Sequence, residues 1–375
     1  MTVATEADPT CPSCGGHVTP GERFCEACGA DLGEPAPAPP ATPMVPAAVT
    51  PPAAATPTGA CRSCGGEVAD DGYCTRCGTA AAKPRDHFTE QPAPWVAAVC
   101  DRGIRHHRNE DAVALAAAPP PAARAVLVVC DGVSTSTDSD VASLAAARAA
   151  RDVLATSQPR GLGTAASSVA ATAKALSNAV DAANDAVIAN TAPGAGSPAS
   201  CTFVAAVVDG PVLVVGWVGD SRAYWLPDAG GALLLTTDDS FAAEQIAAGI
   251  DRAVAENGPH AHAITRWLGT DAPDHTPRTV SVDLDTPGWV LVCSDGLWNY
   301  CSAPQDLAGL LGATMDTVGA QPLPLAAALV EWANAQGGRD NITVALARID
   351  PTTTATAGPS ADHREEVSPD GNVLS

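Results

Sequence analysis

The stretch Leu127-Val-Val-Cys-Asp-Gly-Val133 determines how the rest of the chain is interpreted. Its apolar run leads directly into an acidic residue and a glycine, which predicts a buried strand that ends with a carboxylate at the rim of a sheet. The glycine lets the backbone turn and approach whatever the carboxylate holds. Two further runs have the same design, Val214-Val-Gly-Trp-Val-Gly-Asp-Ser-Arg222 and Val290-Leu-Val-Cys-Ser-Asp-Gly-Leu297. One such end is an ordinary turn signal, whereas three indicate a carboxylate cluster that binds metal.

Composition narrows the class of protein. The chain has 375 residues, of which 46% are hydrophobic and only 4% aromatic, so we expect alanine-rich helices packed over a sheet of valine and leucine. The net charge of −22 argues against nucleic acid as a partner of the whole chain. No signal peptide and no membrane span are recognisable, because an Asp-Gly turn interrupts the most apolar stretch, 201–219. We therefore expect a cytoplasmic protein whose 13 cysteines are thiols or metal ligands.

A cysteine-rich unit occurs twice near the N-terminus. Each copy reads Cys-x-x-Cys-Gly-Gly, a short loop, an aromatic residue and Cys-x-x-Cys-Gly, and so supplies four thiolates for a tetrahedral structural zinc ion. So short a unit has no apolar core, so zinc must provide most of its folding free energy. The alternative, a redox dithiol, normally accompanies a βαβ fold that this segment lacks. The predicted zinc ligands are Cys11, Cys14, Cys25 and Cys28 in the first copy and Cys61, Cys64, Cys74 and Cys77 in the second.

Both copies resemble the zinc-ribbon family, which implies a docking or regulatory arm that contacts other proteins. Binding of nucleic acid by the arm is a weaker alternative, because its basic residues are few. Changes in composition divide the chain into zinc ribbon 1 (1–33), a Pro/Ala-rich linker (34–58), zinc ribbon 2 (59–79), a second linker (80–94), a main domain (95–350) and a disordered tail (351–375).

In the main domain, predicted strands come in runs and predicted helices come in pairs, which indicates an α+β fold rather than alternating βαβ units. The expected helices cover 139–155, 164–190, 241–256, 305–311 and 325–336. The expected strands include 97–100, 112–116, 201–208, 212–218, 223–226, 233–236, 279–284, 289–293 and 342–349, besides the opening stretch.

Acidic residues that end strands or begin turns are spread over this whole domain. Oxygen ligands suit Mg²⁺ or Mn²⁺, and carboxylates brought together without a cation would repel one another. Two such ions bridged by one aspartate and a water can activate that water to attack a phosphate. The residues in question are Glu110, Asp111, Asp131, Asp220, Asp295 and Asp340.

The order and spelling of these motifs resemble the PPM family, the protein phosphatase 2C type, over residues 95–350. The resemblance implies a four-layer αββα sandwich of two antiparallel sheets flanked by helices, and a metal-dependent protein serine/threonine phosphatase. The matching motifs are Arg108-Asn-Glu-Asp-Ala112, Val129-Cys-Asp-Gly132, Val218-Gly-Asp-Ser-Arg222, Cys293-Ser-Asp-Gly-Leu-Trp298 and Gly338-Arg-Asp-Asn-Ile-Thr343.

Carried over position by position, the resemblance implies that Asp131 bridges two Mn²⁺ or Mg²⁺ ions, with the carbonyl of Gly132 beside it. Asp295 and Asp340 would complete the shell of one ion. Asp220 matches an acid that, with Asp295, holds a third and weaker ion in bacterial members. With zinc in both ribbons, the expected cofactors are two or three Mn²⁺ or Mg²⁺ ions and two structural Zn²⁺ ions.

The resemblance assigns the other catalytic ion to Glu110 or Asp111, directly or through water. The family usually has a phosphate-gripping arginine four residues before this glutamate, where the present chain has His106. Asn341 matches a neighbour that hydrogen-bonds solvent or ligand. The residues available to contact phosphate are therefore His106, Arg105 and Arg108.

Two hypotheses about function follow. The first is hydrolysis of phosphoserine and phosphothreonine in proteins, with phosphorylated proteins as partners, a Ser/Thr kinase or its substrates among them. The second is a pseudophosphatase that serves as a binding or scaffold module, which the histidine at position 106 motivates. No covalent phosphoenzyme is expected, because no Cys or Asp nucleophile motif appears. The five cysteines of the main domain lie in or beside apolar strands, and we expect them to be small core residues.

Overall fold

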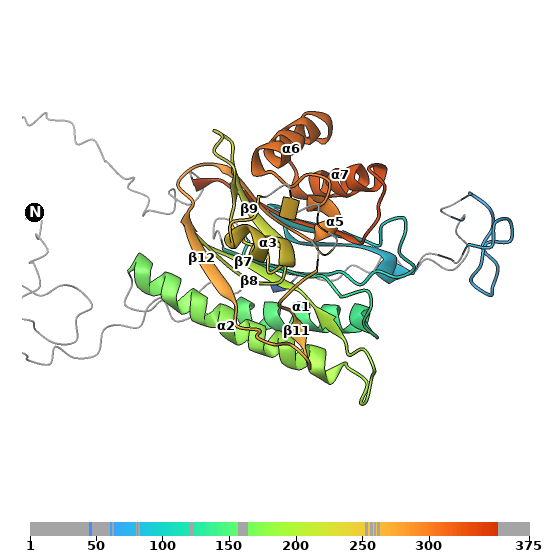
Figure 1. The fold of residues 1–375 in the computed structure, drawn as a ribbon. Helices are drawn as coiled ribbons and strands as arrows, with labels where there is room; N and C mark the ends of the chain where they lie inside the picture. The colour runs from blue at the N-terminus through green and yellow to red at the C-terminus, as the bar shows by residue number, and fades with distance from the viewer. Residues whose placement is uncertain are drawn as a thin grey trace, which may run out of the picture. The chain divides into compact units, whose positions relative to one another are not determined.

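The computed structural model (Figure 1) describes Val45–Pro46, Cys61, 64–79, Ala81, 83–119, 124–156, 164–251, 254–255, Gly258, His260 and 263–351. The four cysteines predicted to bind zinc in the first ribbon and the predicted disordered tail beyond Pro351 lie outside these residues.

Two six-stranded sheets form the centre of the main domain, and every strand pair in them is antiparallel. The first sheet has the order β1 (Val45–Pro46), β4 (Ala112–Ala117), β5 (Arg124–Cys130), β7 (Phe203–Asp209), β8 (Val212–Val218) and β12 (Arg278–Asp283). The second has the order β10 (Leu233–Leu234), β9 (Arg222–Pro227), β13 (Gly288–Cys293), β14 (Ile342–Ile349), β3 (Val96–Asp101) and β2 (His87–Ala93). The short strands β6 (Ser200–Cys201) and β11 (Leu268–Gly269) pair separately.

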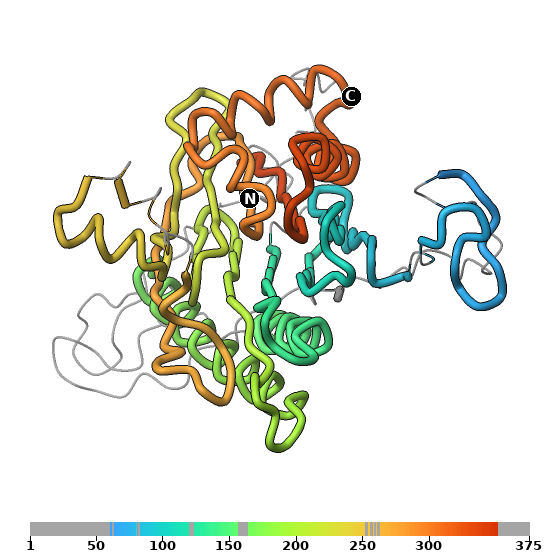
Figure 2. Tube along the Cα trace, turned by 45° about the vertical axis from the view of Figure 1, so that its right-hand side comes forward, coloured from blue at the N-terminus to red at the C-terminus, as the bar shows by residue number. Residues whose placement is uncertain are grey.

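Helices cover the outer face of each sheet, as Figures 1 and 2 show. Helices α1 (Ser139–Ala155) and α2 (Ala165–Ala189) pack on the first sheet. Helices α5 (Asp295–Trp298), α6 (Pro304–Val318) and α7 (Pro322–Ala335) pack on the second. Two shorter helices in the described part of the chain are η1 (Pro84–Asp86) and α3 (Phe241–Ala247). No helix in the described part of the chain combines the length and the apolar character that a membrane span requires.

The opening stretch shows why the layers form. Side chains alternate between the two faces of a strand, so β5, which is apolar from Ala125 to Cys130, buries both of its faces. Val126 and Val128 pack against α1 and α2, whereas Leu127 and Val129 pack between the two sheets. The predicted α+β class and the four-layer αββα sandwich are therefore confirmed.

The structure differs most from the prediction in two helix ends and in the first predicted linker. Helix α3 ends at Ala247 rather than near residue 256, because the chain enters the left-handed region at Gly249 (φ 90°). Helix α6 continues past residue 311 to Val318, where Gly319 (φ 83°) follows it. In the segment predicted as the first linker, Val45–Pro46 pairs with β4 at the edge of its sheet.

The second predicted linker, 80–94, is wrong for most of its length. It contains η1 and the edge strand β2, which pairs with β3. The inward positions of β2 include Phe88 and Glu90, both buried. A charged residue at an inward position, together with Pro92, hides the apolar alternation by which a strand is recognised.

Glu90 makes the stability of the protein depend on pH. Its side chain is 1% exposed, Oε2 accepts a hydrogen bond from the amide of Leu115 (2.7 Å), and Oε1 has no hydrogen-bond partner in the described residues. Burial raises the pKa of this carboxyl from 4.5 to about 7. Because the folded state binds the proton more tightly than the unfolded state does, the stabilising contribution is complete below pH 4.5 and is lost as the pH rises through about 7.

Because of Glu90, the free energy of unfolding of the wild type should fall by roughly 3 kcal/mol between those two pH values. We expect Glu90→Gln to abolish this fall. Urea unfolding of both proteins at a series of pH values measures this difference. Glu331→Gln makes the same change at an exposed position of α7 and should keep the wild-type pH profile. A Glu90→Gln profile parallel to that of the wild type would show that Glu90 titrates normally.

Candidate active site and zinc site

Antiparallel pairing brings the predicted acids to one rim of the sheets. In the first sheet, Cys130 at the end of β5 pairs with Ala112 at the start of β4. Asp131 follows the first of these residues and Asp111 precedes the second, so both carboxylates leave the sheet at the same edge.

The second sheet contributes the other acids in the same way. The end of β13 lies between the start of β9 and the start of β14. Asp295 follows β13 after one residue, Asp220 precedes β9, and Asp340 precedes β14. Burial and then the charges of these three acids and of Asp111 raise the pKa of Asp131 well above its usual range. Five of the six predicted acids therefore form one electrostatic cluster, which we call the carboxylate cluster: Asp111, Asp131, Asp220, Asp295 and Asp340.

Hydroxyl and amide groups orient two members of the cluster. Asp111 Oδ2 accepts hydrogen bonds from the hydroxyls of Ser294 (2.6 Å) and Thr343 (2.7 Å), and burial raises the pKa of this carboxyl to about 6. Asp295 Oδ2 accepts one from Asn299 Nδ2 (2.9 Å). The Oδ1 atom of each aspartate is buried and has no hydrogen-bond partner in the described residues. Buried oxygens of this kind are costly unless a cation binds them.

The donor set fits Mg²⁺ or Mn²⁺. It consists of carboxylate oxygens, which these hard cations prefer, and in the described residues no arginine or lysine is ion-paired with Asp111, Asp131 or Asp295. No three of the described acids bring oxygens all within 4.8 Å of one another, so binding a cation would draw the side chains together. The positive charge of the cation would offset the repulsion between the carboxylates.

Glu110 is held apart from the cluster. It is 3% exposed, and its Oε1 accepts hydrogen bonds from Arg108 Nη2 (2.8 Å) and the Ser139 hydroxyl. Burial raises the pKa of Glu110, but the contact with His106 and hydrogen bonds from Ser139 and Arg108 outweigh burial and bring the pKa to about 2. Arg108 also donates to the carbonyl of Ser136 (2.9 Å). Arg108 therefore holds Glu110 and the start of α1.

His106 lies between Glu110 and the carboxylate cluster. Its Nε2 is 3.2 Å from Asp340 Oδ1, and its Nδ1 is 3.7 Å from Glu110 Oε2. The contact with Glu110 and the surrounding acids raise the pKa of the imidazole. The ring is 24% exposed, so a ligand can reach it. Arg105 is exposed.

Asn341 has a different role from the one predicted. Its Oδ1 accepts a hydrogen bond from the amide of Glu110 (2.7 Å), and its Nδ2 donates to the carbonyls of Arg102 (2.7 Å) and Arg108 (3.1 Å). Because both amide hydrogens are used and the residue is 2% exposed, its side chain is not available to solvent or ligand. Asn341 instead fixes the loop that carries His106.

Two glycines allow the backbone to approach this site closely. A Cβ on Gly132 would lie 2.7 Å from the carbonyl oxygen of Glu110, and a Cβ on Gly296 would overlap the carbonyl of Asn341. Both glycines follow an acid of the carboxylate cluster. Gly132 is therefore required because it packs against the loop that ends at Asp111. Gly296 is required because it packs against the loop that leads into β14.

Sequence reasoning missed the groups that orient the acids, although the motifs contain some of them. Ser294 and Thr343 stand inside two of the quoted motifs, whereas Ser139 and Asn299 have no such signal. The prediction that the cysteines of the main domain are core residues is confirmed, since Cys100, Cys130, Cys201, Cys293 and Cys301 are all buried.

The second cysteine unit forms a compact four-sulfur site. The sulfurs of Cys61, Cys64, Cys74 and Cys77 all lie within 4.8 Å of one another, with Cys61 to Cys77 at 3.6 Å and Cys64 to Cys74 at 3.5 Å. A tetrahedral zinc ion with Zn–S bonds of about 2.3 Å requires sulfurs about 3.8 Å apart. The four sulfurs therefore fit a structural zinc ion.

Comparisons with known proteins agree with both sites. The family model described as protein phosphatase 2C matches residues 104–334, more than half of the chain. The model described as double zinc ribbon matches residues 11–78, which include the cysteines of both units.

The serine/threonine phosphatase stp of Listeria monocytogenes is 33% identical over 152 residues, which are 40% of this chain and 57% of that protein. The chain thus matches little more than half the length of this relative. The serine/threonine phosphatase of S. agalactiae has the same fold, with a TM-score of 0.57 and 23% identity over 68% of this chain and 99% of that one. The catalytic domain of the phosphatase PstP, solved with two manganese ions, has a TM-score of 0.50 and 26% identity over 68% of this chain and 98% of that one.

Proposed function

This chain belongs to the protein phosphatase 2C family, and we propose that it hydrolyses phosphoserine and phosphothreonine in proteins with the help of Mn²⁺ or Mg²⁺. The observation that carries the proposal is the carboxylate cluster, whose acids lie at one rim and include two buried oxygens without hydrogen bonds in the described residues. No arginine or lysine in the described part of the chain is ion-paired with Asp111, Asp131 or Asp295. The two manganese ions of PstP support the choice of metal.

The bound ions would acidify a water molecule and neutralise charge that develops on the phosphoryl oxygens. The water oxygen forms a bond to phosphorus while the bond to the serine or threonine oxygen breaks, and that oxygen takes up a proton. Inorganic phosphate and the free hydroxyl are the products. Direct attack by water is consistent with the burial of every cysteine in the described part of the main domain, since none can reach a phosphate.

The side chains divide this work. Asp131, with the carbonyl of Gly132, would serve two ions, and Asp295 and Asp340 would complete the shell of one of them. Asp111 offers its free Oδ1 to the cluster while Ser294 and Thr343 keep its other oxygen in position.

Three further residues complete the proposal. Glu110 already accepts hydrogen bonds from Arg108 and Ser139, so it would bind the second ion through water rather than directly. A ring N–H of His106 can donate to a phosphoryl oxygen where the family usually has arginine, since its Nε2 already lies at the edge of the cluster. Asp220 would share a third ion with Asp295.

The expected partners are phosphorylated proteins, among them a Ser/Thr kinase or its substrates. The zinc ribbons would act as a docking arm for these proteins, because a closed four-cysteine site has no position for substrate chemistry. The cytoplasm is the compartment in which free thiols and intracellular phosphoproteins coexist.

Release of inorganic phosphate from a phosphoserine peptide tests this function. The full-length protein should hydrolyse the peptide when Mn²⁺ or Mg²⁺ is added and should lose the activity when EDTA removes the metal. A preparation that binds Mn²⁺ and the peptide, but stays at background at every pH from mildly acidic to mildly alkaline, would support the pseudophosphatase hypothesis instead.

A further inference from the structure

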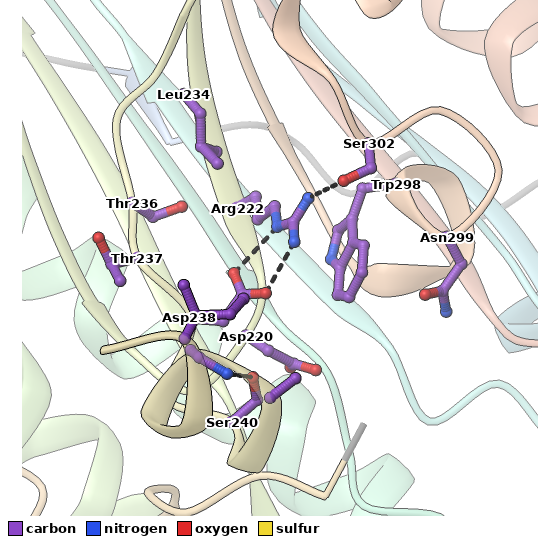
Figure 3. Close-up of a pocket in the computed structure, with 13 residues that line it drawn as sticks. Asp220, Arg222, Leu234, Thr236, Thr237, Asp238, Ser240, Trp298, Asn299 and Ser302 are labelled. Carbon is purple, nitrogen blue, oxygen red and sulfur yellow. Dashed lines mark hydrogen bonds and ion pairs between the residues drawn. The ribbon is translucent and has the colours of Figure 1, made fainter. Parts of the chain in front are cut away.

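A pocket of about 290 Å³ opens beside the carboxylate cluster (Figure 3). Residues of β9, β10, α3 and α5 line it. Asp220 belongs both to the lining and to the cluster. Asn299, on another wall, hydrogen-bonds Asp295 Oδ2 at 2.9 Å. A substrate whose phosphate lies at the cluster can therefore extend a neighbouring side chain into this pocket.

The charged groups of the pocket compensate one another. Arg222 donates to both carboxylate oxygens of Asp238 (2.9 and 2.7 Å) and to the Ser302 hydroxyl (2.8 Å). Its guanidinium carbon lies 3.7 Å from the ring centroid of Trp298. Figure 3 shows the arginine between these partners. Asp238 neutralises Arg222, and Asp220 belongs to the carboxylate cluster. Among the residues that line the pocket, no unpaired cation therefore remains to bind an acidic side chain.

Besides these groups and the hydroxyls of Thr236, Thr237 and Ser240, the lining contains four aliphatic side chains. Leu234 forms one wall, and Ala242, Ala243 and Ile246 of α3 form another. Half of the exposed large apolar side chains in the described residues belong to this part of the chain: Leu233, Leu234, Phe241, Ile250 and Val254. Of these five, Leu234 lines the pocket itself. Exposed apolar side chains that are close together are typical of a surface that contacts a partner.

We propose that this pocket is a specificity subsite that binds one bulky aliphatic side chain next to the phosphorylated residue of the substrate. The inference rests on the proposed phosphatase function and adds to it the class of peptide preferred. The volume is slightly below the range of about 300–1,000 Å³ common for small-molecule sites, which suits a single side chain. An acidic side chain would find no free cation among the lining residues and is disfavoured.

Phosphoserine peptides in a glycine background test the subsite, with leucine, lysine or glutamate placed in turn at each flanking position. At one position we expect leucine to raise kcat/KM roughly tenfold to a hundredfold over glycine, as filling an apolar pocket does, and glutamate to lower it. Lysine exceeding leucine at that position would overturn the apolar assignment.

Two variants of α3 form a matched pair. Ala243→Leu fills the pocket and should remove the preference for leucine, whereas Ala247→Leu makes the same change at an exposed residue outside the lining and should retain it. Loss of the preference in both variants, or in neither, would contradict the subsite.

Binding measurements separate this inference from the proposed function. Fluorescence anisotropy with the same peptides reports affinity without turnover, and p-nitrophenyl phosphate reports turnover without a flanking side chain. Leucine-selective binding with no hydrolysis of any substrate would reject the phosphatase function and keep the pocket. Hydrolysis of all peptides at equal rates and with equal affinity would reject the pocket and keep the function.

Discussion

Asp131→Asn is expected to lower kcat/KM for a phosphoserine peptide about 1000-fold or more at saturating Mn²⁺. The charges of four other acids converge on Asp131, and its backbone is fixed by a hydrogen bond from its amide to the Thr202 hydroxyl (3.0 Å). An asparagine of the same shape keeps that backbone position but loses the negative charge that two cations would share. Release of phosphate by the purified variant measures the effect.

The same substitution should stabilise the metal-free protein. Removing one charge from a buried group of carboxylates relieves repulsion, so in EDTA the variant should have a higher Tm than the wild type. Added Mn²⁺ should then raise the Tm of the wild type by more than that of the variant, because a ligand stabilises only the state that binds it. These opposite effects distinguish loss of a metal ligand from misfolding.

Asp138→Asn is the matched control. Asp138 is exposed and caps the start of α1 without a side-chain hydrogen bond, and the change from aspartate to asparagine is identical. It should keep wild-type activity and wild-type response to Mn²⁺. An Asp131→Asn protein that is folded and retains more than about a tenth of wild-type activity would show that Asp131 does not bind the catalytic metals.

The acids at the strand ends could be predicted because their positions depend on local pattern. A run such as 127–130 is apolar at every position, so it must be buried on both faces, and the residue after it must lie at a rim. Antiparallel pairing then decides which rims coincide, and the resemblance to a family supplied that pairing. This is why Asp131 and Asp295 were identified together although 163 residues separate them.

What could not be predicted depends on contacts between distant side chains. Arg108 and Asn341 belong to recognisable motifs. The sequence does not show that Arg108 donates its hydrogen bonds to Glu110, or that Asn341 hydrogen-bonds the backbone of the loop that carries Glu110. Strand β2 was missed because Glu90 occupies a core position at which a pattern of hydrophobicity expects an apolar residue. In each case a polar group is satisfied by a partner that local sequence does not reveal.

Removal of zinc is expected to unfold the second ribbon, residues 61–79, while the main domain stays folded. In this segment the buried apolar-type residues are Cys61 and Cys74, themselves predicted metal ligands, so no separate core can hold the chain. Binding of a structural zinc ion to such a site contributes about 10–16 kcal/mol, which is more than so short a unit could otherwise supply. A nitrogen-donor chelator selective for zinc, added in the presence of Mn²⁺, should cause fast hydrogen exchange in residues 64–79 and leave phosphatase activity intact.

Cys74→Ser and Cys301→Ser extend the test, since the chemical change is the same at a zinc ligand and at a cysteine of the main domain. Cys74→Ser should lose one zinc per chain in metal analysis and expose the ribbon to proteolysis, because three thiolates leave the coordination shell open. Cys301→Ser should keep the wild-type zinc content. Protection of residues 64–79 that persists after complete removal of zinc would mean that hydrogen bonds such as Cys74 N–H to the Thr79 carbonyl (2.8 Å) are sufficient to hold the ribbon, and that the metal is not its core.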